Sequence, residues 1–183
     1  MNEETSARAT PAGNSAFRSA LRRFGFFLIM AGWMGGFTFY AEVVIPVAAH
    51  VLGTERTVGF ITQQVTGWLN LIGTAALLYC LWNLRVERRG LPAPLRSWLA
   101  WTWLAMALCQ AGLFVTHHFL DGLLQPAGRT IHDFDRFQVL HQMYLVFATV
   151  QWLAALLHIW KTLDAWRQVP FPGNRGERTL AEG

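Results

Sequence analysis

The feature that most constrains the fold of this sequence is an apolar run from Phe24 to Val51. The run directly follows three basic residues, Arg18, Arg22 and Arg23. A helix rises about 1.5 Å per residue, so about 20 apolar residues are enough to cross the roughly 30 Å hydrocarbon core of a bilayer. The run therefore predicts a transmembrane helix that begins just after the basic segment.

Three further apolar segments follow, and together they predict an all-α fold, an integral membrane four-helix bundle. Only 14% of the 183 residues are charged, whereas a soluble domain usually carries about 25%. Short connections predict antiparallel, up-down neighbours. We expect a four-span domain over 21–168, with disordered polar tails at 1–20 and 169–183. The expected spans are about 24–49, 65–84, 97–120 and 137–160.

The basic residues are distributed unevenly between the two sides of the predicted bundle. Twelve of the fifteen Lys and Arg residues fall on the side of the termini, and three fall on the other side. Such a bias predicts that both termini are cytoplasmic, in the cell inner membrane. The basic pI near 9.7 therefore reflects charges that flank the spans. We expect the lipid bilayer as the main partner, and no nucleic acid.

Gly32 and Gly36 in the first span form a G-x-x-x-G pair. Small residues at this spacing let two helix backbones approach closely within a membrane. Two uses stay open: packing inside the bundle, or a homodimer through Gly32 and Gly36. The two cysteines, Cys80 and Cys109, are expected to be small apolar core residues.

Each span has one face of small or polar residues at helical spacing, and in lipid such faces should turn inward. In the first span this face holds Ala31, Gly35, Thr38, Glu42 and Ala49. In the fourth it holds His141, Tyr144, Ala148, Gln151, Ala155 and His158. Depth counting predicts a polar pocket in the half of the bundle away from the termini, with His158 at the opposite interface. The candidate pocket residues are Glu42, Asn70, Gln110, His117, His141 and Tyr144.

Ionisable groups inside spans indicate function more often than ordinary core residues do. Glu42 is either a carboxyl group that hydrogen-bonds to Asn70 or Tyr144, or a metal, proton or ligand contact. A set of histidines is either interfacial, with hydrogen bonds to the Asp-rich loop from Asp121 to Arg136, or forms ligands; the set is His50, His117, His118, His132 and His141. A divalent metal would be bound by His117, His118, His141 and Asp121. A haem b would be held by His117 and His141.

The sequence contains no phosphate-binding loop, no dinucleotide fingerprint, no H-E-x-x-H and no G-x-S-x-G. The lack of a nucleotide site excludes a primary pump. Two hypotheses stay open. The first is a non-enzymatic accessory or small-solute-handling protein with a polar pocket. The second is a haem- or metal-binding redox membrane protein that uses His117 and His141.

Two stretches carry a resemblance to a known family. They are GGFTFYAEVVIPVAAHVLG in the first span and the F-x-x-L-H-x-x-Y pattern of Phe137, Leu140, His141 and Tyr144. The chain resembles the transmembrane-protein-205-like family of small four-helix membrane proteins of undefined role. The resemblance implies a four-span fold without an established activity, so it transfers no site residue. The His117–His118 pair has no counterpart in that family pattern.

Overall fold

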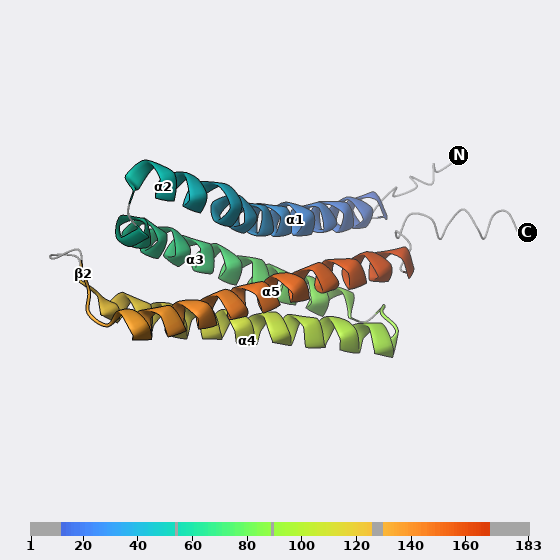
Figure 1. Cartoon of the computed structure of the whole chain (residues 1–183). Coiled ribbons are helices and arrows are strands. Elements are labelled where there is room, and N and C mark those ends of the chain that lie inside the picture. Colours follow the sequence, from blue (N-terminus) through green and yellow to red (C-terminus); the bar gives the residue numbers. More distant parts are fainter. Residues whose placement is uncertain (1–11, 54, 89, 126–129, 169–183) are drawn as a thin grey trace, which may run out of the picture.

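The computed structural model describes residues 12–53, 55–88, 90–125 and 130–168 of the chain. Almost all of these residues are helical, and the long helices lie side by side (Figure 1). A two-residue antiparallel ribbon pairs Leu124 with Ile131 and Gln125 with Thr130. In chain order the elements are α1 (Ala12–Phe39), the π-helix η1 (Tyr40–Val44), α2 (Ile45–Leu52), α3 (Glu55–Glu87), α4 (Ala93–Leu123), β1 (Leu124–Gln125), β2 (Thr130–Ile131) and α5 (Phe134–Gln168).

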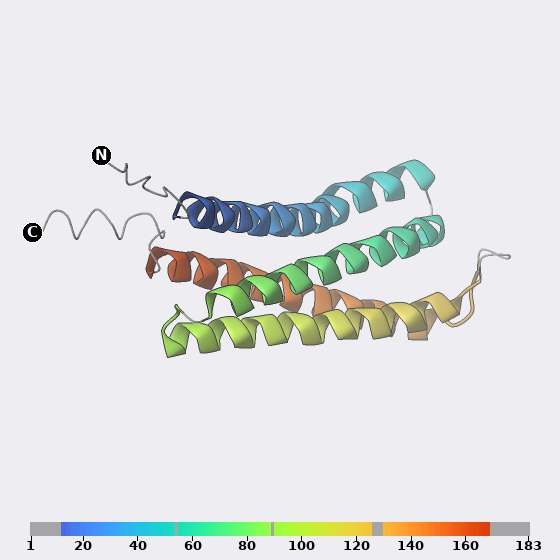
Figure 2. The same cartoon turned by 180° about the vertical axis from the view of Figure 1, so that it is seen from behind.

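The helices run up and down, with α1 to α2, α3, α4 and α5 as four successive passes (Figures 1 and 2). All four passes are long and apolar enough to cross a membrane, which confirms the prediction of an all-α, multi-pass membrane protein. We call the end where α1 begins and α5 ends the terminal end. The opposite end, where α2 ends and α5 begins, is the loop end.

The helices extend beyond the expected spans, because hydropathy marks only the part of a helix that lies in hydrocarbon. The tail expected at 1–20 is partly wrong, since α1 already begins at Ala12. Ala and Ser supply five of the nine residues from Ala12 to Ala20, and neither interrupts a helix. Residues 1–11 and the expected tail at 169–183 lie outside the described residues.

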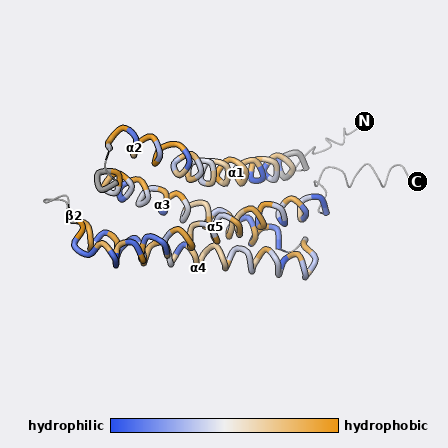
Figure 3. The backbone as a smooth tube through the Cα atoms, viewed as in Figure 1, coloured by the Kyte–Doolittle hydropathy of each residue, from blue (hydrophilic) through white to orange (hydrophobic). Residues whose placement is uncertain are grey.

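Large apolar side chains remain exposed along every pass, as expected of a surface covered by lipid. Among them are Leu28, Leu71, Leu108 and Val146, each more than half exposed. Figure 3 shows that apolar residues recur along all four long helices. Apolar surface this extensive is rare on soluble monomers, and it therefore agrees with the prediction of a membrane protein.

The first pass changes direction at η1, just before Pro46 (Figure 1). Proline lacks the N–H group of an α-helical hydrogen bond, and its ring crowds the carbonyl of the residue four positions earlier. The chain accommodates Pro46 with a wider turn, in which the Ile45 N–H bonds to the Tyr40 carbonyl, five residues back. The bend of the first pass therefore coincides with a π-turn, a feature that is frequent at functional sites.

The core of the bundle is formed by bulky side chains of α1 packed on small side chains of α3. Phe26, Met30 and Trp33 are buried and belong to one core cluster with Ala76 of α3. A Cβ atom added at Gly73 would lie 2.8 Å from the indole nitrogen of Trp33. The absence of a side chain at Gly73 therefore makes room for the Trp33 ring.

The small-residue face of the first pass points away from the bundle, which corrects two expectations. Gly32, Gly35 and Gly36 are exposed, and an added Cβ atom at any of them would meet nothing within 4 Å. Ala31, Thr38 and Glu42 are exposed as well, whereas Ala49, although exposed, lines a pocket of the bundle. The bulky face of α1 is the one that turns inward, because its side chains fill the space beside the small residues of α3. The prediction that Gly32 and Gly36 pack inside the bundle is therefore wrong, and the prediction of a homodimer through them stays untested.

Candidate functional site

A pocket of about 900 Å³ opens at the loop end, which we call the loop-end pocket. One wall comes from α1, η1 and α2, and the other comes from α3, α4, α5 and the ribbon. The volume lies within the range of sites for drug-sized ligands, about 300–1,000 Å³. Its lining includes Phe37, Tyr40, Ala41, Ile45, Ala49, Gly59, Thr62, Gln63, Thr66, His117, Asp121, Phe134, Phe137, Gln138, His141, Gln142 and Tyr144.

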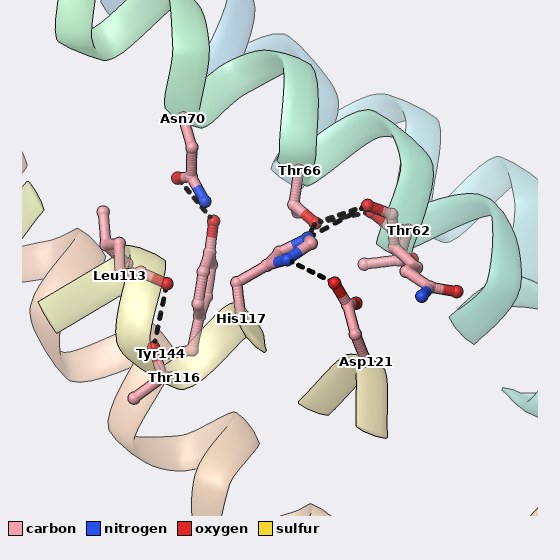
Figure 4. Close-up of polar contacts among 9 residues, drawn as sticks. Thr62, Thr66, Asn70, Leu113, Thr116, His117, Asp121 and Tyr144 are labelled. Carbon is pink, nitrogen blue, oxygen red and sulfur yellow. Dashed lines mark hydrogen bonds and ion pairs between the residues drawn. The ribbon is translucent and has the colours of Figure 1, made fainter. Parts of the chain in front are cut away.

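His117 of α4 lines the loop-end pocket, and both of its ring nitrogens have polar contacts (Figure 4). Its Nδ1 lies 3.0 Å from Oδ2 of Asp121, one helical turn later. Its Nε2 lies 3.1 Å from the Thr66 hydroxyl and 3.1 Å from the Gln63 carbonyl oxygen. The Thr66 hydroxyl itself donates to the Thr62 carbonyl at 2.7 Å.

The partners of the two His117 nitrogens can all accept a hydrogen bond. The Asp121 carboxylate faces Nδ1. The Gln63 carbonyl oxygen and the Thr66 hydroxyl face Nε2, and the hydrogen of that hydroxyl already points to the Thr62 carbonyl. A ring with a proton on each nitrogen therefore satisfies every contact. Neither nitrogen can bind a metal ion unless one of these contacts is broken.

Deeper in the bundle, a buried polar network joins α3, α4 and α5. The Tyr144 hydroxyl donates to Oδ1 of Asn70 at 3.1 Å (Figure 4). Gln110 donates to the Asn70 carbonyl oxygen at 3.1 Å, and Gln151 donates to Oε1 of Gln110 at 2.8 Å. All four side chains are at most 6% exposed. Since Tyr144 also lines the loop-end pocket, the network forms the floor of the pocket.

Two polar atoms of the pocket lining lack a hydrogen-bond partner of normal geometry among the described residues. They are the Tyr40 hydroxyl and Oδ1 of Asp121. Tyr40 is only 6% exposed, and the nearby Thr62 hydroxyl, which interacts with it, is donated to the Val58 carbonyl oxygen. A buried hydroxyl without a hydrogen bond costs about 1–3 kcal/mol. A ligand that bonds to Tyr40 would recover that energy.

The other pocket groups are neutral side chains and aromatic rings. His141 is half-buried, and its ring is parallel to that of Phe137, with the ring centres 6.1 Å apart. Gln138 and Gln142 line the same wall. Among the described lining residues there is no Arg or Lys. The pocket therefore offers hydrogen-bonding groups and a carboxylate, but no permanent cation.

The structure brings together most of the residues predicted for the site. Asn70, Gln110 and Tyr144 share the buried network, and His117, His141 and Tyr144 line the loop-end pocket. The inward face predicted for the fourth span is also confirmed: Tyr144, Ala148, Gln151, Ala155 and His158 are all buried.

The placement of Glu42 was wrong. Its side chain is exposed on η1 and does not line the pocket. The prediction assumed that the small residues of the first span face inward, whereas the bulky face of that helix does. The hydrogen bonds expected from Glu42 to Asn70 or Tyr144 are absent from the described contacts, because Glu42 lies at an exposed position of η1.

The predicted set of four metal ligands is not assembled. Among the described residues, no group of three or more His, Cys, Asp or Glu residues could hold a metal ion. His118 is exposed, because neighbours on a helix point about 100° apart and His117 takes the inward direction. Asp121, a second predicted ligand, is bound to His117 instead.

Sequence reasoning missed Tyr40 and the true position of His158. Tyr40 has a recognisable signal, a single phenol six residues before Pro46 in an otherwise apolar run. His158 was expected at the interface, yet it is 1% exposed, and its Nδ1 lies 2.9 Å from the Thr102 hydroxyl. The α5 helix continues ten residues past His158, to Gln168, and this length places the ring inside the bundle.

No protein-family model, no curated protein and no solved structure matches the chain. The resemblance to the transmembrane-protein-205-like family therefore remains a prediction from two short stretches. The site has to be interpreted from its own geometry.

Proposed function

We propose that the chain is a four-span protein of the cell inner membrane that holds a small ligand in the loop-end pocket. Its role in this proposal is accessory or solute-handling rather than enzymatic. The observation that carries the proposal is Tyr40, which lines a pocket of about 900 Å³ and whose buried hydroxyl lacks a hydrogen bond of normal geometry among the described residues. Oδ1 of Asp121 supplies a second such atom.

The proposal includes an orientation for the pocket. Segments at the terminal end carry the large excess of Arg and Lys, which favours cytoplasmic termini. The loop-end pocket then lies in the outer half of the bilayer and faces the outside of the cell. A ligand would reach it without entering the cytoplasm.

The competing proposal is a haem- or metal-binding redox protein. It is supported by His117 and His141, which line the same pocket from α4 and α5. Ligation by His117 first requires the loss of its contact with Asp121, or of its contacts with Thr66 and Gln63. An absorbance spectrum and metal analysis of the purified protein test it. A Soret band or stoichiometric metal that His117→Ala abolishes would favour this alternative.

Cysteine labelling tests the ligand-pocket proposal directly. Ala41 lines the pocket, so we expect Ala41→Cys to react with a small charged methanethiosulfonate added outside intact cells. The wild type is the blank, since Cys80 and Cys109 are 0% and 7% exposed. Ala148→Cys is the matched control, because Ala148 is 4% exposed and does not line the pocket.

The labelling result tests separately whether the pocket is open and which side of the membrane it faces. If Ala41→Cys resists the reagent on both sides of the membrane, the pocket is closed and the proposal fails. If it reacts only in inverted vesicles, the pocket exists but the orientation is the reverse.

A further inference from the structure

We infer that the ligand of the loop-end pocket is an uncharged lipid-phase molecule whose head is a hydroxyl-bearing aromatic ring, the chemistry of a hydroquinone. This inference rests on the proposed function and names the class of molecule that the pocket takes. Four features of the pocket carry it: its charge, its ring-lined walls, the packing around it and its two unpartnered oxygen atoms.

The charge of the pocket disfavours anionic ligands. Among the described residues the lining includes Asp121 and no Arg or Lys. Two lining residues can become cationic, His117 and His141. The ring nitrogens of His117 already face Asp121 and the Gln63 carbonyl oxygen, and the ring of His141 is stacked on Phe137. Phosphate and carboxylate heads need cationic or multiple N–H donors. Phospholipids, fatty acids and nucleotides are therefore poor candidates, and an uncharged head fits.

The pocket walls favour a ring. Phe37, Tyr40, Phe134, Phe137 and Tyr144 all line it, together with the imidazole of His141. Aromatic side chains pack on ring ligands in offset or edge-on geometry, which adds to the gain from apolar burial. A flat head could lie between the ring of Tyr40 on η1 and the rings on α5.

Packing around the pocket favours access from the lipid. The α2 helix packs on α3, whereas packing between α2 and α5 is slight at most. These two helices nonetheless supply opposite walls of the pocket, with Ile45 and Ala49 on α2 and Phe137 and His141 on α5. A ligand tail can leave between them toward the bilayer, which is the solvent at this depth in a membrane-spanning bundle.

The two unpartnered atoms fit a hydroxyl head. Oδ1 of Asp121 can only accept a hydrogen bond when the group is ionised, and the Tyr40 hydroxyl can donate or accept. A hydroquinone supplies a hydroxyl donor for Asp121 and a ring oxygen for Tyr40. The oxidised quinone has no hydroxyl to donate to Asp121, so the reduced form should bind more tightly.

The test uses decylubiquinol, kept reduced under argon, with the purified full-length protein in detergent. Binding is followed as the dose-dependent rise in melting temperature, and as protection of Ala41→Cys from the thiol reagent. We expect Tyr40→Phe and Asp121→Asn each to weaken binding about tenfold, the effect of one lost hydrogen bond. Tyr79→Phe and Glu42→Gln make the corresponding chemical changes, loss of a phenol hydroxyl and of a carboxylate charge, outside the pocket. Both variants should bind decylubiquinol as the wild type does.

Decylubiquinone and lauric acid serve as comparison ligands. Weaker binding of both supports the inference, while equal or tighter binding of lauric acid overturns it and leaves the proposed pocket in place. Equal binding of decylubiquinol by Tyr40→Phe and Asp121→Asn also overturns it. If no probe binds and Ala41→Cys is not labelled, both the inference and the proposed function fail.

Discussion

The indole N–H of Trp166, in the last turn of α5, donates a 2.6 Å hydrogen bond to Oε2 of Glu87, the last residue of α3. Oε1 of the same carboxylate lies 2.8 Å from a guanidinium nitrogen of Arg22 in α1. The Arg23 guanidinium lies over the Trp166 ring, 5.1 Å from its centre. One carboxylate at the terminal end therefore connects three of the four passes.

The first prediction concerns this carboxylate. Glu87→Gln removes the charge beside Arg22 and Arg23, while all three side chains stay about nine-tenths buried. Loss of one member of a buried ion pair leaves the other charge uncompensated, so we expect a loss of about 3 kcal/mol in unfolding free energy. Unfolding in mixed micelles at increasing SDS fraction measures it.

The matched control is Glu42→Gln, the same chemical change at an exposed position of η1. It should leave the unfolding curve within about 0.5 kcal/mol of the wild type. Similar losses from both substitutions would show that the bundle does not depend on the terminal-end cluster.

The second prediction concerns the contact between α1 and α3. Gly73→Ala places a Cβ atom 2.8 Å from Nε1 of Trp33 and 2.8 Å from Oε1 of Gln110. Overpacking of this kind costs about 1–3 kcal/mol. Thermal unfolding followed by circular dichroism measures the change. Gly32→Ala is the control, because nothing lies within 4 Å of its added Cβ atom; equal stability of the two variants would contradict the packing described here.

The helices and the inward face of α5 could be predicted because both follow from regular geometry. The α5 helix is a single uninterrupted element from Phe134 to Gln168, so a rotation of about 100° per residue places Tyr144, Gln151 and His158 on one face. That face is also the polar one, and in lipid the polar face turns inward. The helical periodicity and the preference of polar groups to avoid lipid therefore both predict the same buried face for α5.

The buried face of the first pass could not be predicted by the same reasoning. There, the small and polar residues lie on one face, whereas the bulky side chains that fill the core lie on another. Its small residues suggested an inward face, yet the space beside Gly73 and Ala76 is filled by Trp33 and Met30. Which face is buried depends on the shape of the partner helix, which hydropathy does not encode. Tyr40 lies seven residues after Trp33 and therefore on the same face of the helix, so it lines the pocket once the bulky face is inward.

The third prediction isolates the hydrogen bond between Tyr144 and Asn70 at the floor of the pocket. A double-mutant cycle of Tyr144→Phe and Asn70→Leu should give a coupling energy of about 0.6 kcal/mol, the average for side-chain pairs between transmembrane helices. SDS unfolding of the two single variants and the double variant measures it. Strict additivity would mean that the bond, 3.1 Å long, contributes nothing to stability.

The fourth prediction concerns the homodimer through Gly32 and Gly36. Both glycines are exposed on α1, with open space where a side chain would be, and a second copy of this helix could approach there closely enough for backbone contact. Gly36→Ile should shift the chain from dimer to monomer in sedimentation equilibrium in detergent, by tenfold or more in dissociation constant. Gly122→Ile places the same side chain at an exposed glycine of α4 and should leave the dimer intact. A wild-type protein that sediments as a monomer at all concentrations would exclude this interface, and the exposed glycines would then be a surface that only lipid contacts.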